Sequence, residues 1–186
     1  MEADWEFEVG GDAPVIEACW PGFIDLRLSP QRARDLPEAV RFPALAAVLE
    51  TLNSRTSSVW TSKCDFWPTL DADTFDPDEL DAAPASCAHA VGCYIDLLPG
   101  GGQQWFHPHL AEGACRQICS ILRQAPMRCC RVDLVVRRAT VALDVTGLGI
   151  TAYLTACGPT AGDAERVLAA ALAVFGGALI GDSTLQ

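Results

Sequence analysis

The segments RVDLVVRRATVAL (residues 131–143) and LGITAYLTAC (residues 148–157) decide the fold. In both, aliphatic residues alternate with charged, hydroxyl-bearing or aromatic ones, which is the period of a strand with one buried face. Turn-forming residues at 144–147 join the two segments, so the pair predicts a β-hairpin. Its aliphatic residues should lie in a core beneath helices; they are Val132, Leu134, Val136, Ile150, Ala152 and Leu154.

The rest of the chain supplies further strands and the helices that cover them. Apolar residues three and four apart predict helices within residues 29–53, at 109–126 and at 161–175. Pro37 and Pro43 should divide the first helical region into short pieces, because proline lacks a backbone donor. The predicted order is strand, strand, helix, repeated three times. The additional strands are predicted at residues 5–9, 15–28, 57–67 and 88–98.

A four-residue similarity indicates how these elements could be arranged. FIDL (residues 23–26) and YIDL (residues 94–97) each end a predicted strand, and a strand with a central aspartate follows each of them. This pattern fits two βαβ halves and a ferredoxin-like core, with Asp25 and Asp96 on adjacent strands. Three successive ββα units are the alternative. Either arrangement predicts one α+β domain over residues 1–186, with a largely antiparallel sheet of about six strands and three helical regions on one face.

Composition narrows the classes of function. The chain has 186 residues, 50% of them apolar, and a formal net charge of −11, which disfavours nucleic acid and anionic membranes as partners. The most apolar run, residues 167–180, is shorter than the roughly 20 residues of a membrane span. The acidic N-terminal segment lacks the features of a secretory signal, so we expect a cytoplasmic protein whose nine cysteines are reduced. Adjacent Cys129 and Cys130 should point to opposite faces of a strand.

The sheet face opposite the aliphatic one collects the candidate functional residues. Strand parity places aspartates, cations and aromatic residues on it. We expect this face to contact a small-molecule ligand or a second copy of the chain in a homodimer, because rings beside charges form a patch suited to contact. A solvated face with surface salt bridges is the alternative. The candidate residues are Asp25, Arg27, Lys63, Asp65, Trp67, Tyr94, Asp96, Asp133, Arg137 and Tyr153, and Thr61 shares their parity.

An enzyme is the second hypothesis for this chain. His107, His109 or the strand aspartates could serve in hydrolase-type or isomerase-type acid–base chemistry, with Pro108 starting a helix between the two histidines. No cluster has the spacing of a metal site, and no motif for a cofactor is found. The acidic run at residues 71–81 departs from a calcium-binding loop, so we interpret Asp76 as the cap of a short helix.

Overall fold

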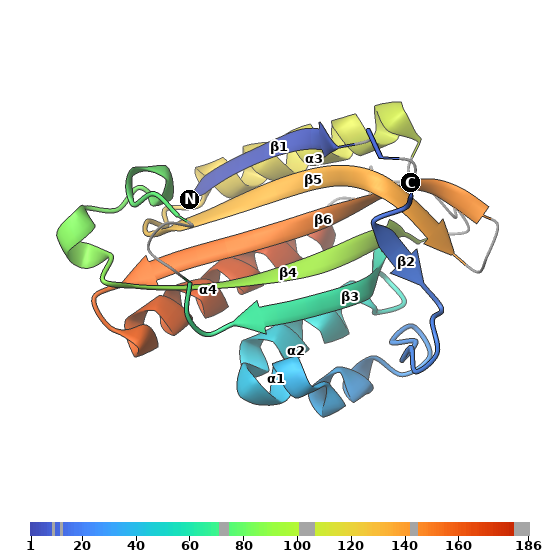
Figure 1. Ribbon diagram of the computed structural model, residues 1–186, viewed down its shortest axis with the longest axis horizontal. Coiled ribbons are helices and arrows are strands. Elements are labelled where there is room, and N and C mark those ends of the chain that lie inside the picture. Colours follow the sequence, from blue (N-terminus) through green and yellow to red (C-terminus); the bar gives the residue numbers. More distant parts are fainter. Residues whose placement is uncertain (9, 12, 71–74, 101–106, 142–144, 181–186) are drawn as a thin grey trace.

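The computed structural model describes residues 1–8, 10–11, 13–70, 75–100, 107–141 and 145–180. They form an α+β fold in which helices cover one face of a six-stranded mixed sheet (Figure 1). The strand order is β1-β5-β6-β4-β3, and β2 also pairs with β5. The strands are β1 (Glu2–Glu8), β2 (Ile16–Ala18), β3 (Val59–Trp67), β4 (His89–Pro99), β5 (Cys130–Val141) and β6 (Val145–Gly158).

Several helices begin at proline, where the missing N–H would have no partner within the helix. As predicted, Pro37 and Pro43 divide the first helical region into short pieces. Helices α2, α3 and α4 lie behind the sheet in Figure 1. The helices are η1 (Pro30–Asp35), α1 (Pro37–Arg41), α2 (Pro43–Leu52), η3 (Asp78–Leu80), η4 (Pro84–Ser86), α3 (Pro108–Gln124) and α4 (Ala161–Ile180).

Strands β5 and β6 form the predicted hairpin. Its six aliphatic residues, named above, are at most 1% exposed and belong to the main core with side chains of α2, α3 and α4. The predicted turn is too long at its end, because Val145 already pairs with Val141 and residues 145–147 belong to β6. Asp144 lies outside the described residues. Alternation along two paired strands was therefore sufficient to identify the buried face.

The N-terminal region differs from the prediction. Both β1 and β2 run parallel to β5 and do not pair with each other, which makes the sheet mixed. The strand predicted at residues 15–28 ends at Ala18, and a β-turn follows in which the Phe23 N–H donates to the Trp20 carbonyl at 2.9 Å. Gly22 in this turn has a φ of 89°, a conformation that favours glycine.

Because this turn ends the strand, the ferredoxin-like placement of Asp25 on a strand beside Asp96 is wrong. The neighbours of β4, which carries Asp96, are β3 and β6. Residues 23–26 and 94–97 have similar side chains but different backbone conformations, because only the second segment is a strand.

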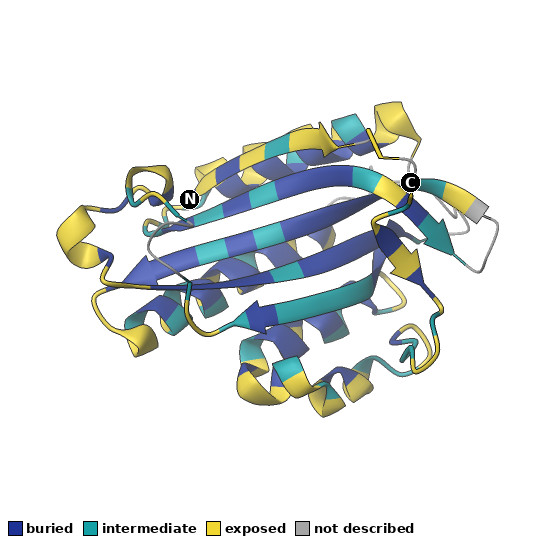
Figure 2. Ribbon diagram, in the orientation of Figure 1, coloured by how far each residue is buried: buried dark blue, intermediate teal, exposed yellow. Residues whose placement is uncertain are grey.

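We call the sheet face away from the helices the open face; it carries the strand residues with the parity of Asp96. A small apolar cluster covers each end of it. At one end β2 packs against Trp60 and Leu98. At the other end Leu80 of η3 packs with Ala90 and Cys157. We call the segments that form these two clusters the walls of the open face. Between the walls the sheet shows a mixture of buried and half-buried residues (Figure 2).

Strand β3 has an irregular pairing between Thr61 and Cys64, which changes the alternation of its side chains. Thr61 pairs with Leu97 and lies on the helix side, where its N–H and hydroxyl bond the Asn53 side chain. Asp65 pairs with Tyr94 and stays on the open face. The prediction that Thr61 shares this face is therefore wrong, because strict alternation fails across a bulge.

Candidate functional site

The centre of the open face is a cluster of three aromatic rings, which we call the ring cluster. Trp67, Tyr94 and Tyr153 come from β3, β4 and β6, and their ring centroids lie 5.7, 6.1 and 6.5 Å apart. The sheet register places Tyr94 directly opposite Tyr153. All three side chains are half-buried, so part of each remains available for contact. Because ring faces carry negative charge density, the cluster suits an apolar or cationic group.

Asp96 is the buried carboxylate of this face, two residues along β4 from Tyr94. It is only 5% exposed and accepts a 2.7 Å hydrogen bond from Thr151 Oγ1. Burial raises the pKa of Asp96 to about 6, while the Thr151 hydrogen bond and the more distant Lys63 and Arg137 charges oppose this rise. Within the described part of the chain Asp96 has no ion-pair partner. A buried carboxylate with a perturbed pKa is typical of a functional site.

Two further strand aspartates of the open face, Asp133 and Asp65, have cationic partners. Asp133 accepts hydrogen bonds from Arg131 Nε at 2.7 and 2.9 Å. Burial raises the pKa of Asp133, and the bond to Arg131 opposes this rise. Asp65 lies 3.6 Å from the Arg41 guanidinium of α1. The negative charge of each of these two carboxylates is therefore balanced by a neighbouring arginine, unlike that of Asp96.

The remaining cations of the open face are also paired within the chain. Arg137 donates to Tyr153 Oη at 2.7 Å and forms an ion pair with Glu8 of β1. Lys63 Nζ lies 3.3 Å from a Glu17 carboxylate oxygen. Among the described residues, the open face thus combines paired cations with a buried acid, Asp96, that has no ion-pair partner, which leaves the face an excess of negative charge.

A pocket of about 460 Å³ adjoins the open face at the edge formed by β3. Lys63 and Tyr94 line it from the sheet, and Trp20 and Phe23 line it from the N-terminal region. Cys64 also lines the pocket, but burial raises the pKa of its thiol to about 12, so it is a poor nucleophile. The pocket therefore offers a mainly aromatic and apolar extension of the site.

Asp25 and Arg27 lie outside the strands, so their predicted placement in the sheet is wrong. Arg27 donates to Asp25 at 2.8 and 2.7 Å, and this bonding lowers the pKa of the Asp25 carboxyl. The Arg27 guanidinium lies 3.8 Å from the centroid of the Trp60 ring. Because the chain turns at Trp20–Phe23, this pair belongs to the wall at one end of the open face.

Sequence reasoning missed Glu17, Trp20 and Phe23. Glu17 pairs with Lys63, and the two aromatic rings contact each other with centroids 4.8 Å apart. A signal for this was available, since Pro21-Gly22 is a strong turn dipeptide that would have ended the predicted strand.

The histidines of the enzyme hypothesis lie away from the aspartates. As predicted, Pro108 is the first residue of helix α3, and His107 precedes it. The ring centroids of His107 and His109 lie 5.5 Å apart. Helix α3 lies behind the sheet, whereas the aspartates are on the open face (Figure 1). In the described ranges no group of three or more His, Cys, Asp or Glu side chains is placed to hold a metal ion.

The expectation that all cysteines are reduced is wrong. Cys87 and Cys157 form a disulfide, and the other seven cysteines are free. Cys129 packs with the apolar cluster around Leu80 and Cys130 lies in the main core, so the two side chains point apart as predicted. The predicted cause is wrong, because Cys129 precedes β5 and has a left-handed φ of 61° instead of an extended backbone.

Comparison of the chain with family models, curated proteins and solved structures found no match. None of the helices in the described ranges has both the length and the apolar character that crossing a membrane requires.

Proposed function

We propose that this protein is a binding module whose open face accepts a small organic cation over the ring cluster. The observation that carries the proposal is Asp96, which is 5% exposed and has no ion-pair partner within the described residues. It lies on the same face of β4 as Tyr94, two residues away. A cation above the rings would be attracted by the ring faces and by the Asp96 charge at short range.

The charge balance of the site supports a cationic ligand over an anionic one. Arg131, Arg137 and Lys63 each already have an acidic partner in this chain. The net charge of −11 adds a long-range attraction for cations. The pocket beside Lys63 and Tyr94 would receive an apolar extension of the same ligand.

Choline and its neutral isostere 3,3-dimethylbutan-1-ol test this proposal by isothermal titration calorimetry at pH 7.5. The two probes have nearly the same shape and differ in charge, so we expect choline to bind at least about tenfold more tightly. Tyr94→Leu keeps an apolar side chain but removes a ring face. Asp96→Asn keeps the shape but removes the charge. Each variant should weaken choline binding by about tenfold.

Asp35→Asn is the matched control, because it removes one carboxylate from the exposed surface of η1, where Asp35 lies 3.8 Å from Arg32. It should leave choline binding unchanged. Equal affinities for the two probes, or unchanged affinity in both site variants, would contradict the proposal. Sedimentation of the same samples tests the other occupant: a dimer that dissociates in Tyr94→Leu would show that a second copy of the chain covers the open face.

A further inference from the structure

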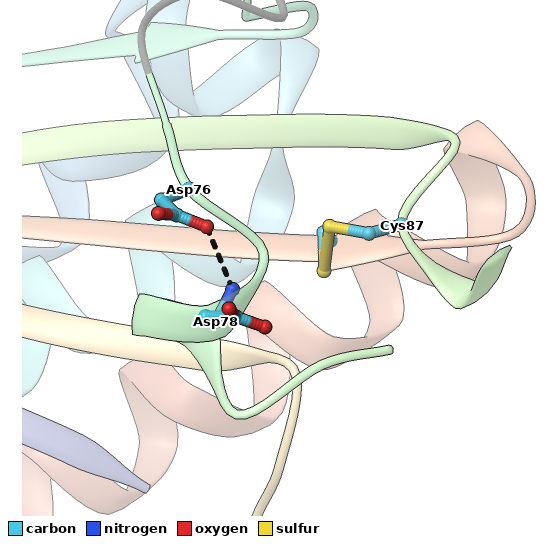
Figure 3. The surroundings of a disulfide bond; sticks show 4 residues. Asp76, Asp78 and Cys87 are labelled. Atoms are coloured by element: carbon cyan, nitrogen blue, oxygen red, sulfur yellow. Dashed lines mark hydrogen bonds between the residues drawn. A yellow bond between two sulfur atoms is a disulfide. The ribbon is translucent and has the colours of Figure 1, made fainter. Parts of the chain in front are cut away.

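Three cysteines meet at the end of the open face where η3 packs. Cys87, just after η4, forms the disulfide with Cys157 of β6, and their Cα atoms are 5.1 Å apart (Figure 3). Cys129 packs against the same small cluster, which also contains Leu80 and Ala90. A free thiol therefore lies beside a disulfide, in a cluster separate from the main core.

The backbone places Cys129 next to Cys157. Cys130 pairs with Ala156 in the β5–β6 ladder, and the Cys157 N–H donates to the Cys129 carbonyl at 2.9 Å. Cys129 immediately precedes β5 and has a left-handed φ of 61°, and this hydrogen bond holds its backbone beside that of Cys157. The two cysteines are therefore neighbours across the start of the β5–β6 ladder.

The free thiol of this cluster is reachable from solvent, whereas Cys87 and Cys157 are buried. Cys129 is half-buried, and with Cys157 it lines a surface pocket of about 360 Å³. The neighbouring Cys130 is buried in the main core on the other side of the strand. Of these two adjacent thiols, only Cys129 has both access to solvent and contact with the disulfide cluster.

We propose that Cys129 makes this cluster an internal thiol–disulfide exchange site. The Cys129 thiolate attacks Cys157 Sγ, so that a Cys129–Cys157 bond forms and the Cys87–Cys157 bond breaks. Cys87 leaves as a thiolate and takes up the proton that Cys129 gave to water. The step transfers no net electrons, because one disulfide and one thiol are present before and after it.

The exchange would release the segment that forms one wall of the open face. In that segment Asp76 accepts a 2.9 Å hydrogen bond from the Asp78 N–H (Figure 3). The prediction that Asp76 is the helix cap is wrong, because η3 begins at Asp78 and its N-cap is Pro77. Residues 71–74 of the predicted acidic run lie outside the described residues. The covalent tether of this segment to β6 is at Cys87, so its loss leaves Leu80 held by noncovalent packing alone. This inference does not depend on cation binding.

Maleimide labelling of the oxidised protein at pH 8.5, without reductant, tests the exchange. Each turnover exposes the Cys87 thiol, so Cys87 should become labelled in the wild-type protein, as measured by mass spectrometry after digestion. Cys129→Ser should lower the rate of Cys87 labelling by about tenfold or more, because serine cannot attack the disulfide. Cys130→Ala is the matched control and should leave the rate unchanged. The rate should also be independent of protein concentration.

Failure to label Cys87 in the wild-type protein, or equal labelling in Cys129→Ser, would overturn the proposal. A second variant keeps the test independent of the folding of Cys129→Ser. In Cys87→Ser/Cys130→Ala, oxidised glutathione should generate a Cys129–Cys157 disulfide and two molecules of glutathione. Absence of that bond in a folded sample would also overturn the proposal.

Discussion

Asp96 and Asp133 lie on the same face of the sheet but differ in their partners. Asp133 bonds the Arg131 guanidinium, whereas Asp96 bonds the neutral hydroxyl of Thr151. Burial raises the pKa of both carboxyls, and for Asp96 the value reaches about 6. Ionisation therefore costs more free energy at Asp96, which has no bonded cation, and a bound cation would lower this cost.

The raised pKa of Asp96 predicts a pH-dependent stability. The pKa is about 6 in the folded protein against an ordinary value of 3.8, so the unfolded chain ionises first as the pH rises. The contribution of this group is greatest below pH 4 and falls between about pH 4 and 6 by up to about 3 kcal/mol. Asp96→Asn should remove this fall, as measured by urea unfolding at pH 3.5, 5 and 8.

Choline binding gives the same prediction an independent check. Affinity for the wild-type protein should rise as the pH passes about 6, because Asp96 becomes charged. In Asp96→Asn this rise should be absent. An unfolding free energy for Asp96→Asn that keeps the wild-type slope between pH 4 and 6 would show that Asp96 does not titrate there.

At the scale of elements, two adjacent glycines of helix α4 lie on different sides of the helix, one packed against α2 and the other exposed. Gly176 is buried, and a Cβ added there would lie 3.0 Å from Val48 Cγ2 of α2. Gly177 is exposed, and a Cβ added there would have no described atom within 4 Å. The close approach of α4 to α2 therefore requires the first glycine and not the second.

Alanine substitutions at these two adjacent glycines should separate helix propensity from packing. Gly177→Ala should stabilise the protein by about 0.5–1 kcal/mol, because glycine is a poor helix former. Gly176→Ala gains the same propensity but crowds Val48, so it should be less stable than Gly177→Ala by about 1 kcal/mol or more. Denaturant unfolding of the two variants measures this difference. The reverse order of stability would show that α4 does not pack on α2 through Gly176.

At the scale of the whole molecule, the two walls of the open face are held by different means. The wall near β2 relies on hydrogen bonds to β5 and on packing around Trp60. The wall formed by residues 75–87 is fastened by the Cys87–Cys157 disulfide, which joins residues 70 positions apart. Closing so long a loop restricts the unfolded chain more than the folded one.

Removal of this disulfide should therefore lower the global stability. Cys87→Ala/Cys157→Ala should reduce the free energy of unfolding by about 2–4 kcal/mol, as expected for a long closed loop. Cys19→Ala is the control, because Cys19 is an exposed free thiol. Chemical denaturation of the three proteins without reductant measures the effect. An unchanged unfolding midpoint in the double variant would mean that the bond contributes nothing to stability.

Much of the architecture could be predicted from local pattern. The hairpin of β5 and β6, the prolines that divide the first helical region, and α3 all follow from periodicity and backbone chemistry. The pairing of β1 with β5 could not be predicted, because a parallel partner 129 positions away leaves no turn signal between the strands. The same holds for the disulfide, since cysteine positions alone do not fix their partners.

By itself, the sequence determined which face of the hairpin is buried and that Asp65, Asp96 and Asp133 belong to the other face, because side-chain alternation is a local property of extended backbone. Only the tertiary structure decided the strand order, the position of Asp25 outside the sheet, and the burial of Asp96 without an ion-pair partner among the described residues. Those outcomes depend on which distant segments pack together, and that choice minimises the energy of the whole chain.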